Sequence, residues 1–364
     1  MRVRIPRVAL VSLVAGALVV AGALPANADG HSGGGQPSQP TVIASGLNNP
    51  RQLSFAPNGD LYVAEAGLGG TASCAAGPEG GSVCFGSSGS VTKITAKGKQ
   101  SRVLTGLPSL AGEGDGSQAA GTSDVSYLGN DKLAVLIGLG GNPVTRAALG
   151  DAGKTMGTLQ QADLRTGKMR KLADLAAYEA RTNPIHDIDS NPVGLEARCG
   201  GYVVADAGGN TVVGISGWRH KLNTLAVLPD VAGGAQAVAT STASGPDGAL
   251  YVSQLTGFPF TQGAASIYRI GRNGSLSVYA SGLTNVTDLA WRGRTLYAVQ
   301  ISTNGLLTGP IGSLVKVAKG STAPTIVAGG LFAPYGLALR GNAAFVTTGS
   351  VAAGAGQVMR IPLS

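Results

Sequence analysis

A repeat of short strand-forming segments runs through the chain and constrains its fold more than any other feature. One unit is VIASGLNNPRQLSFAPNGDLYVAE at 42–65, and related units lie at 122–138, 189–210, 240–254, 284–300 and 332–349. Each unit has two apolar runs joined by a turn rich in Gly, Asn or Asp, which is typical of antiparallel strands. A third run follows every unit, and a fourth follows the first five.

The period of this repeat predicts an all-β fold, a six-bladed β-propeller with four-stranded blades. Successive Leu-Tyr-Val-like strands are about 45 to 75 residues apart, which fits one blade with loops of variable length. A single blade has two apolar faces and cannot bury them alone, whereas stacking the blades around an axis buries both.

The two ends of the repeat predict how the ring closes. The sixth unit supplies only three strands, and one extra strand at 41–45 precedes the first unit. We expect this N-terminal strand to join the C-terminal blade, so that residues 41–364 form a single domain. Residues 171–181 (KLADLAAYEAR) have some helical character, but we expect a strand and a loop there.

The first 28 residues have the order of a secretory signal peptide. Three arginines precede an apolar run at 8–24, and Ala-Asn-Ala at 26–28 provides a cleavage site. The alternative is a membrane anchor, although the run of 17 residues is short of the roughly 20 that a spanning helix needs. Residues 29–40 are mostly Gly, Ser, Pro and Gln, and we expect a flexible lead. The sequence therefore predicts a secreted, extracellular protein.

The charge distribution limits the kinds of partner that the protein can have. The net charge is +8, but the basic residues are scattered along the chain, whereas nucleic-acid-binding proteins cluster them. We expect a monomer whose partner is a small molecule or an extracellular protein, with no nucleic acid and no membrane after cleavage.

Cys74 and Cys84 flank a Gly-rich segment and are predicted to form a disulfide in an oxidising compartment. Cys199 is predicted to be a small buried apolar residue.

A column of polar residues ends the second strands of the blades. Its members are Glu65, Ile137, Asp206, Gln254, Gln300 and Thr348. In the propeller these strand ends approach the mouth of the central channel, where the starts of the innermost strands also lie. The polar side chains either bond open backbone groups or face a ligand. The predicted ligand-binding residues at the mouth are Glu65, Asp206, Gln254, Gln300, Asn191, Phe258 and Phe260.

Phe258 and Phe260 belong to the loop LTGFPF at 255–260. Exposed aromatic side chains in a loop mark a binding surface. The alternative is that both rings fold back as a plug over the channel mouth, and the sequence leaves the two interpretations open.

Catalytic residues are not apparent in the sequence. Glu65, Asn191 and Asp206 offer three oxygen ligands of the kind that Ca²⁺ prefers, so Ca²⁺ is a possible cofactor and no other is indicated. His186 lies beside acidic residues and is either a general base or part of a surface loop. The chain contains no HExxH or P-loop motif.

Several strings of the sequence resemble the ScyD/ScyE family of secreted propellers, which occurs in cyanobacteria and actinobacteria. The strings are GLNNPRQLSFAPNGDLYVAEAG (46–67), IDSNPVGL (188–195), YVVADAGGN (202–210), GPDGALYVSQLTGFPF (245–260) and PYGLAL (334–339). Some of these patterns are shared with NHL-repeat and gluconolactonase-like propellers. Blade four departs from the pattern because no proline precedes its first strand. The resemblance implies export and a propeller, and it implies no established reaction.

Two functions remain open from the sequence. The first is a non-enzymatic propeller that binds a ligand or a protein as an extracellular scaffold. The second is a calcium-assisted lactonase or hydrolase of the gluconolactonase-like type, in which the metal would polarise a carbonyl or activate water. A quinone-dependent oxidation would need a basic cofactor pocket with histidine, for which His186 alone is a weak basis.

Overall fold

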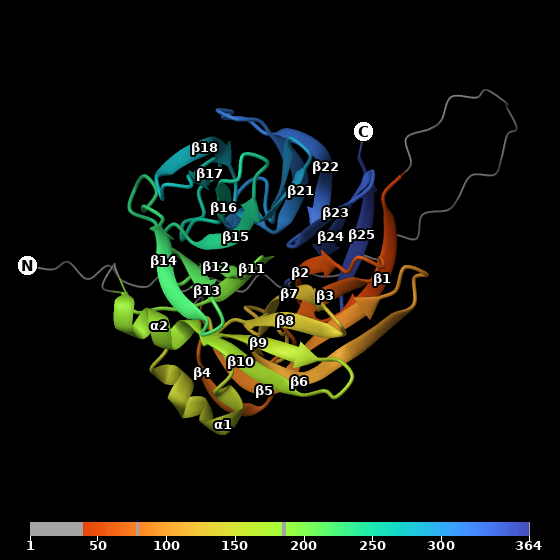
Figure 1. Ribbon diagram of the computed structural model, residues 1–364, viewed down its shortest axis with the longest axis vertical. Coiled ribbons are helices and arrows are strands. Elements are labelled where there is room, and N and C mark those ends of the chain that lie inside the picture. Colours follow the sequence, from red (N-terminus) through yellow and green to blue (C-terminus); the bar gives the residue numbers. More distant parts are fainter. Residues whose placement is uncertain (1–38, 78–79, 184–186, 364) are drawn as a thin grey trace, which may run out of the picture.

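The computed structural model describes residues 39–77, 80–183 and 187–363. The described residues form six antiparallel sheets arranged in a ring, with β2, β7, β11 and β15 near its centre (Figure 1). This confirms the prediction of an all-β, six-bladed propeller. The predicted signal peptide, most of the flexible lead and His186 lie outside the described residues. Within the described part of the chain, no helix is long and apolar enough to cross a membrane.

The blades follow one another in chain order, and each runs from its innermost strand outwards. Blade 1 contains β2 (Pro50–Phe55), β3 (Leu61–Glu65), β5 (Ser82–Ile94) and β6 (Gln100–Gly112), with β4 (Ala72–Ala76) added beside β5. Blade 2 contains β7 (Thr122–Gly129), β8 (Lys132–Ile137), β9 (Thr158–Asp163) and β10 (Met169–Asp174). Blade 3 contains β11 (Pro192–Arg198), β12 (Gly201–Asp206), β13 (Thr211–Ser216) and β14 (Lys221–Val227).

The second half of the ring is more regular. Blade 4 contains β15 (Ala239–Ser244), β16 (Leu250–Gln254), β17 (Ala265–Ile270) and β18 (Leu276–Leu283). Blade 5 contains β19 (Val286–Arg292), β20 (Thr295–Gln300), β21 (Ile311–Val317) and β22 (Thr325–Phe332). Blade 6 contains β23 (Leu337–Arg340), β24 (Ala343–Thr348), β25 (Gly356–Pro362) and the N-terminal β1 (Thr41–Leu47).

The N-terminal strand completes the last blade, as predicted. β1 pairs antiparallel with β25, with Thr41 opposite Arg360 and Leu47 opposite Gly356. The red strand β1 and the blue strand β25 therefore lie side by side in Figure 1. Because these two strands are the most distant in sequence, their hydrogen bonds fix the two ends of the ring to each other.

The hydrophobic core is divided among the junctions between blades. Each of six buried apolar clusters combines residues from two neighbouring blades, including the junction between blades 6 and 1. At the junction between blades 1 and 2, for example, the Tyr62 and Tyr127 rings stack with 5.8 Å between centroids. Stacking around an axis is therefore what removes the apolar faces from water.

Two local predictions were wrong. Residues 175–181 are helical, because β10 ends at Asp174 and α2 (Leu175–Thr182) follows directly. The Asp174 carboxylate caps this helix by accepting a hydrogen bond from the Ala177 N–H at 3.0 Å, and Leu, Ala, Glu and Arg favour helix. Cys199 is exposed rather than buried, because it lies in the tight turn between β11 and β12. The other helices are short: η1 (Thr145–Leu149), α1 (Gly150–Gly153) and η2 (Leu306–Thr308).

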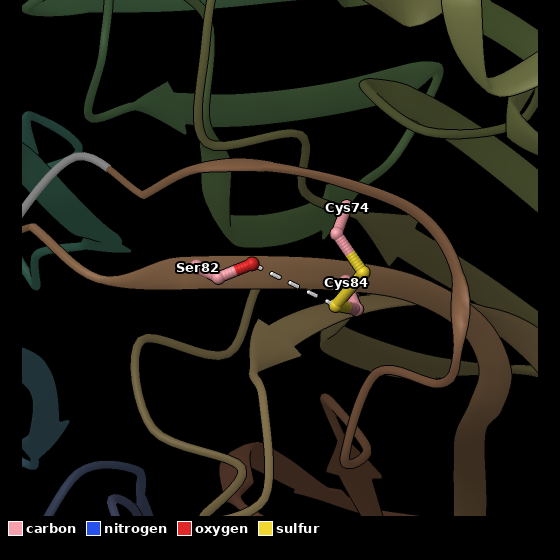
Figure 2. The surroundings of a disulfide bond; sticks show 3 residues. All are labelled: Cys74, Ser82 and Cys84. Carbon is pink, nitrogen blue, oxygen red and sulfur yellow. Dashed lines mark hydrogen bonds between the residues drawn. A yellow bond between two sulfur atoms is a disulfide. The ribbon is translucent and has the colours of Figure 1, made fainter.

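Blade 1 carries an extension at one edge. The first residues of β5 continue past the blade, where they pair with β4 on one side and with the end of β6 on the other. A disulfide joins Cys74 of β4 to Cys84 of β5, and the Ser82 hydroxyl lies 3.9 Å from the Cys84 sulfur (Figure 2). The disulfide therefore attaches the exposed strand β4 to the extension.

Leu47→Ala should destabilise the propeller by about 2–5 kcal/mol, the usual cost of truncating a fully buried leucine. Leu47 is completely buried in the cluster that joins blade 6 to blade 1. Val42→Ala on the same strand is the control, because Val42 is 50% exposed. Urea unfolding measures both variants. Equal stability of the two variants would contradict the role of β1 in closing the ring.

Candidate functional site

A cavity of about 400 Å³ opens at the mouth of the central channel, and we call it the mouth cavity. Its wall lies where the second strands end and the innermost strands begin, and all six blades contribute to it. The apolar part of the lining comes mainly from Val83, Leu110, Leu139, Val193, Leu255, Phe260, Ile301, Leu306, Leu307 and Val351. The polar side chains in the lining are Arg51, Gln118, Ser123, Asn191, Tyr335 and Ser350.

Arg51 is the charged side chain of this lining. Its guanidinium donates to the Ser350 carbonyl at 2.6 Å and to the Ala119 carbonyl at 2.7 Å. It also lies over the Tyr335 ring, 4.8 Å from the centroid. Burial lowers the pKa of Arg51, and Tyr335 opposes this shift. In the described part of the chain no carboxylate pairs with this half-buried cation.

Tyr335 and Asn191 provide two further polar groups from opposite parts of the ring. Tyr335 precedes β23 of blade 6, and Asn191 precedes β11 of blade 3. Neither the phenol hydroxyl nor the Asn191 carboxamide forms a hydrogen bond with a described residue. Ser123, in contrast, donates to the Pro192 carbonyl at 2.9 Å and is already engaged. The Ser350 hydroxyl also has no partner among the described residues, so the mouth cavity combines an apolar wall with four polar side chains that retain hydrogen-bonding capacity.

Two buried carboxyl groups lie on the innermost strands behind this lining. Asp124 accepts hydrogen bonds from the Leu195 and Val125 N–H groups, each at 2.6 Å. Asp288 accepts from the Leu337 N–H at 2.7 Å and from the Ser241 hydroxyl at 2.6 Å. Each carboxyl group therefore joins its own blade to the next one. Burial raises the pKa of Asp124 well above its ordinary value and that of Asp288 to about 7.

The predicted polar column lies one layer behind the cavity wall. Glu65 is fully buried and accepts hydrogen bonds from the Asn48 N–H at 2.7 Å and the Thr92 hydroxyl at 2.6 Å. It also forms an ion pair with Arg102 at 2.8 Å. Asp206 accepts from the Asn191 N–H at 2.6 Å, and burial raises its pKa to about 6.

The two glutamines of the column behave in the same way. The Gln300 side-chain oxygen accepts from the Thr284 N–H at 2.7 Å, and that of Gln254 accepts from the Ser266 N–H at 3.0 Å. These four buried residues fix backbone segments around the mouth and are not in the cavity lining. Of the seven predicted site residues, Asn191 and Phe260 line the cavity.

The structure does not assemble the calcium ligands that the sequence suggested. Asn191 lines the mouth cavity, whereas Glu65 and Asp206 do not. The Glu65 oxygens are bound by Arg102 and three other donors, and the Asp206 oxygens are bound by backbone N–H groups and the Ser190 hydroxyl. Among the described residues there is no group of three or more His, Cys, Asp or Glu side chains placed to hold a metal ion.

The two phenylalanines of the 255–260 loop have different positions. Phe260 is half-buried and lines the cavity, while the Phe258 ring is 63% exposed. The rings meet edge to face, with 6.3 Å between centroids. Phe260 thus forms part of the cavity wall and Phe258 part of its outer rim.

Arg51 and Tyr335 are not among the site residues that were predicted from the sequence. The signal that could have singled them out is their position after Pro50 and Pro334, which the repeat aligns with the cavity-lining Val193 after Pro192.

Comparison with known proteins shows the fold alone. No protein-family model matches the chain, and no curated protein does. Among solved structures, a protein named as a candidate gluconolactonase is 10% identical with a TM-score of 0.50, over 90% of this chain and 94% of that one. Virginiamycin B lyase from Staphylococcus aureus is 11% identical with a TM-score of 0.46, over 90% and 99%. A nidogen/laminin complex contains a chain that is 10% identical with a TM-score of 0.46, over 73% and 84%.

The free energy of unfolding should fall as pH rises from 5 to 7. The folded Asp288 carboxyl, with a pKa of about 7, holds a proton that the unfolded chain releases near pH 4. The contribution of the protonated Asp288 carboxyl to the free energy of unfolding is therefore complete below about pH 4 and is lost as pH approaches 7. One such group contributes a slope of up to about 1.4 kcal/mol per pH unit, which Asp288→Asn should remove.

The control for this measurement is Asp247→Asn. Burial opposes ionisation of Asp247, but Arg269 and other partners lower its pKa, so it titrates below this pH window. Urea unfolding at several pH values compares the three proteins. An unchanged slope in Asp288→Asn would exclude a protonated Asp288 carboxyl between the blades.

Proposed function

We propose that this chain is a secreted, non-enzymatic propeller that binds a small ligand in the mouth cavity. Export through a signal peptide at 1–28 and membership of the ScyD/ScyE family are parts of the proposal. The observation that carries it is the lining of the mouth cavity, which is largely apolar and includes four polar side chains with unused hydrogen-bonding capacity. Small-molecule sites usually have this composition.

The arrangement of the carboxyl groups supports binding over catalysis. A general base must reach the proton that it removes. Asp124 and Asp288 are buried and use their oxygens between blades, while Glu65 and Asp206 lie behind the cavity wall. The lactonase alternative depends on the Glu65, Asn191 and Asp206 set, whose two carboxylates are already bound by other donors.

Phe260→Ser should weaken ligand binding by roughly tenfold or more, because removing a phenyl contact costs about 1.5–3 kcal/mol. The probe is the neutral dye N-phenyl-1-naphthylamine, whose fluorescence rises in apolar sites. Phe332→Ser is the matched control, because Phe332 is 46% exposed on the outer strand β22 and is absent from the cavity lining. Failure of the unmodified protein to bind the dye, or equal affinity of both variants, would contradict binding at the mouth.

Two further measurements on the unmodified protein distinguish ligand binding from calcium-dependent hydrolysis. Adding CaCl₂ should leave the thermal unfolding midpoint unchanged, and a panel of aldonolactones should remain intact. Hydrolysis that requires Ca²⁺ and disappears in Glu65→Gln would support the lactonase instead.

Export should leave a mature chain that begins at Asp29, because cleavage is predicted after Ala28. Expression of the full chain in a secreting bacterial host, followed by N-terminal sequencing of the protein in the medium, checks this. Retention in the membrane fraction with residues 1–28 attached would favour the anchor instead.

A further inference from the structure

We propose that the mouth cavity selects an organic monocarboxylate with an apolar body. Its carboxylate would be bound by Arg51 and Tyr335, and its body would lie against the wall formed by Phe260 and Leu306. This inference rests on the proposed binding function and adds the chemical class of the ligand to it.

The unpaired charge of Arg51 is the first step of the argument. A guanidinium has five N–H donors, and in Arg51 two hydrogen bonds to backbone carbonyls are formed. These neutral carbonyls hold the side chain in place but do not balance its charge. A half-buried cation without a counter-ion has lost part of its hydration, so an incoming anion regains electrostatic energy there. Arg matches carboxylate geometry because two of its N–H groups can bond both oxygens.

Tyr335 supplies a second donor beside this cation. Its ring is held under the Arg51 guanidinium, which fixes the two groups relative to each other. Thr287 donates to the Tyr335 backbone carbonyl at 2.7 Å, so the backbone that carries the ring is also anchored. The phenol hydroxyl forms no bond with a described residue and remains available. A preorganised pair of donors loses little entropy when a ligand binds.

The acidic residues near the cavity do not cancel the attraction of Arg51 and Tyr335 for an anionic ligand. Asp124 and Asp288 affect the ionisation of Tyr335, although burial is the main cause of the raised pKa of its phenol and Arg51 opposes the rise. Both carboxyl groups are buried and bonded to backbone N–H groups of the next blade. Burial raises the pKa of Asp288 to about 7, so near pH 7 part of this group is neutral and repels an anion less than a full charge would, and burial shifts the pKa of Asp124 in the same direction.

The remaining wall of the cavity suits an apolar body. Phe260, Leu306, Leu139 and Ile301 line it from three different blades. At about 400 Å³ the cavity falls in the range of small-molecule sites, about 300–1,000 Å³. The apolar surface continues outwards to Phe258 and Leu307, which are 63% and 50% exposed. A small inorganic anion would leave this wall in contact with water, whereas an amphipathic carboxylate would cover it.

Isothermal titration calorimetry of the full secreted chain tests the proposal with three matched probes: octanoate, octanol and octylamine. Octanoate should bind at one site per chain at least tenfold more tightly than either of the other probes, because hydrogen bonds to charged groups contribute about 1.5–3 kcal/mol. Arg51→Gln should remove this preference. Arg294→Gln is the charge-matched control, since Arg294 is exposed in the turn between β19 and β20.

Tyr335→Phe keeps the ring and removes only the hydroxyl, so it tests the site even if Arg51→Gln disturbs the loops that Arg51 joins. Its affinity for octanoate should fall roughly three- to tenfold, with that for octanol unchanged. Equal affinity for octanoate and octanol would overturn the carboxylate preference. If the neutral dye still binds and depends on Phe260, the binding function survives that result. If the unmodified protein binds neither octanoate nor the neutral dye, the carboxylate preference and the binding function are both overturned.

Discussion

Packing between neighbouring blades is the constraint on which the rest of this structure depends. The buried apolar clusters lie at junctions between blades, so no single sheet has a core of its own. Each junction needs both of its blades, and the junction between blades 6 and 1 needs the pairing of β1 with β25. A channel mouth with contributions from six blades is a direct result, because equivalent loops of stacked sheets must meet at one end of the axis.

Hydrogen bonds from buried carboxyl groups then join neighbouring blades around the channel. Asp124 and Asp288 reach the backbone of the next blade, so neighbouring inner strands are joined near the axis. Gly194 and Gly336 allow the backbones to approach closely, since a Cβ at either position would lie 2.5 Å from a carbonyl oxygen of the following blade. The carboxyl groups are thus used in assembly, and the polar groups of the cavity lining that retain hydrogen-bonding capacity are Arg51, Tyr335, Asn191 and Ser350.

The architecture could be predicted from the sequence because each blade corresponds to a local sequence pattern that repeats along the chain. The alternation of apolar strands and turns predicted the six blades, and the missing fourth strand of the sixth unit predicted the closure by the N-terminal strand. The site was harder, because a polar residue at a strand end has the same sequence signature whether it bonds a backbone or a ligand. Glu65 was predicted as a ligand-facing residue, yet its partners Asn48, Thr92 and Arg102 come from segments whose proximity only the folded chain shows.

The extension of blade 1 contains a disulfide that lies next to the wall of the mouth cavity. Val83, which lines the cavity, precedes the disulfide-bonded Cys84, and Leu110 on the paired strand β6 lines it too. Phe85, the residue after Cys84, and Leu110 also pack in the apolar cluster between blades 1 and 2, so this wall is continuous with that junction. An environment that keeps the disulfide formed would therefore stabilise this cavity wall and the adjoining junction together.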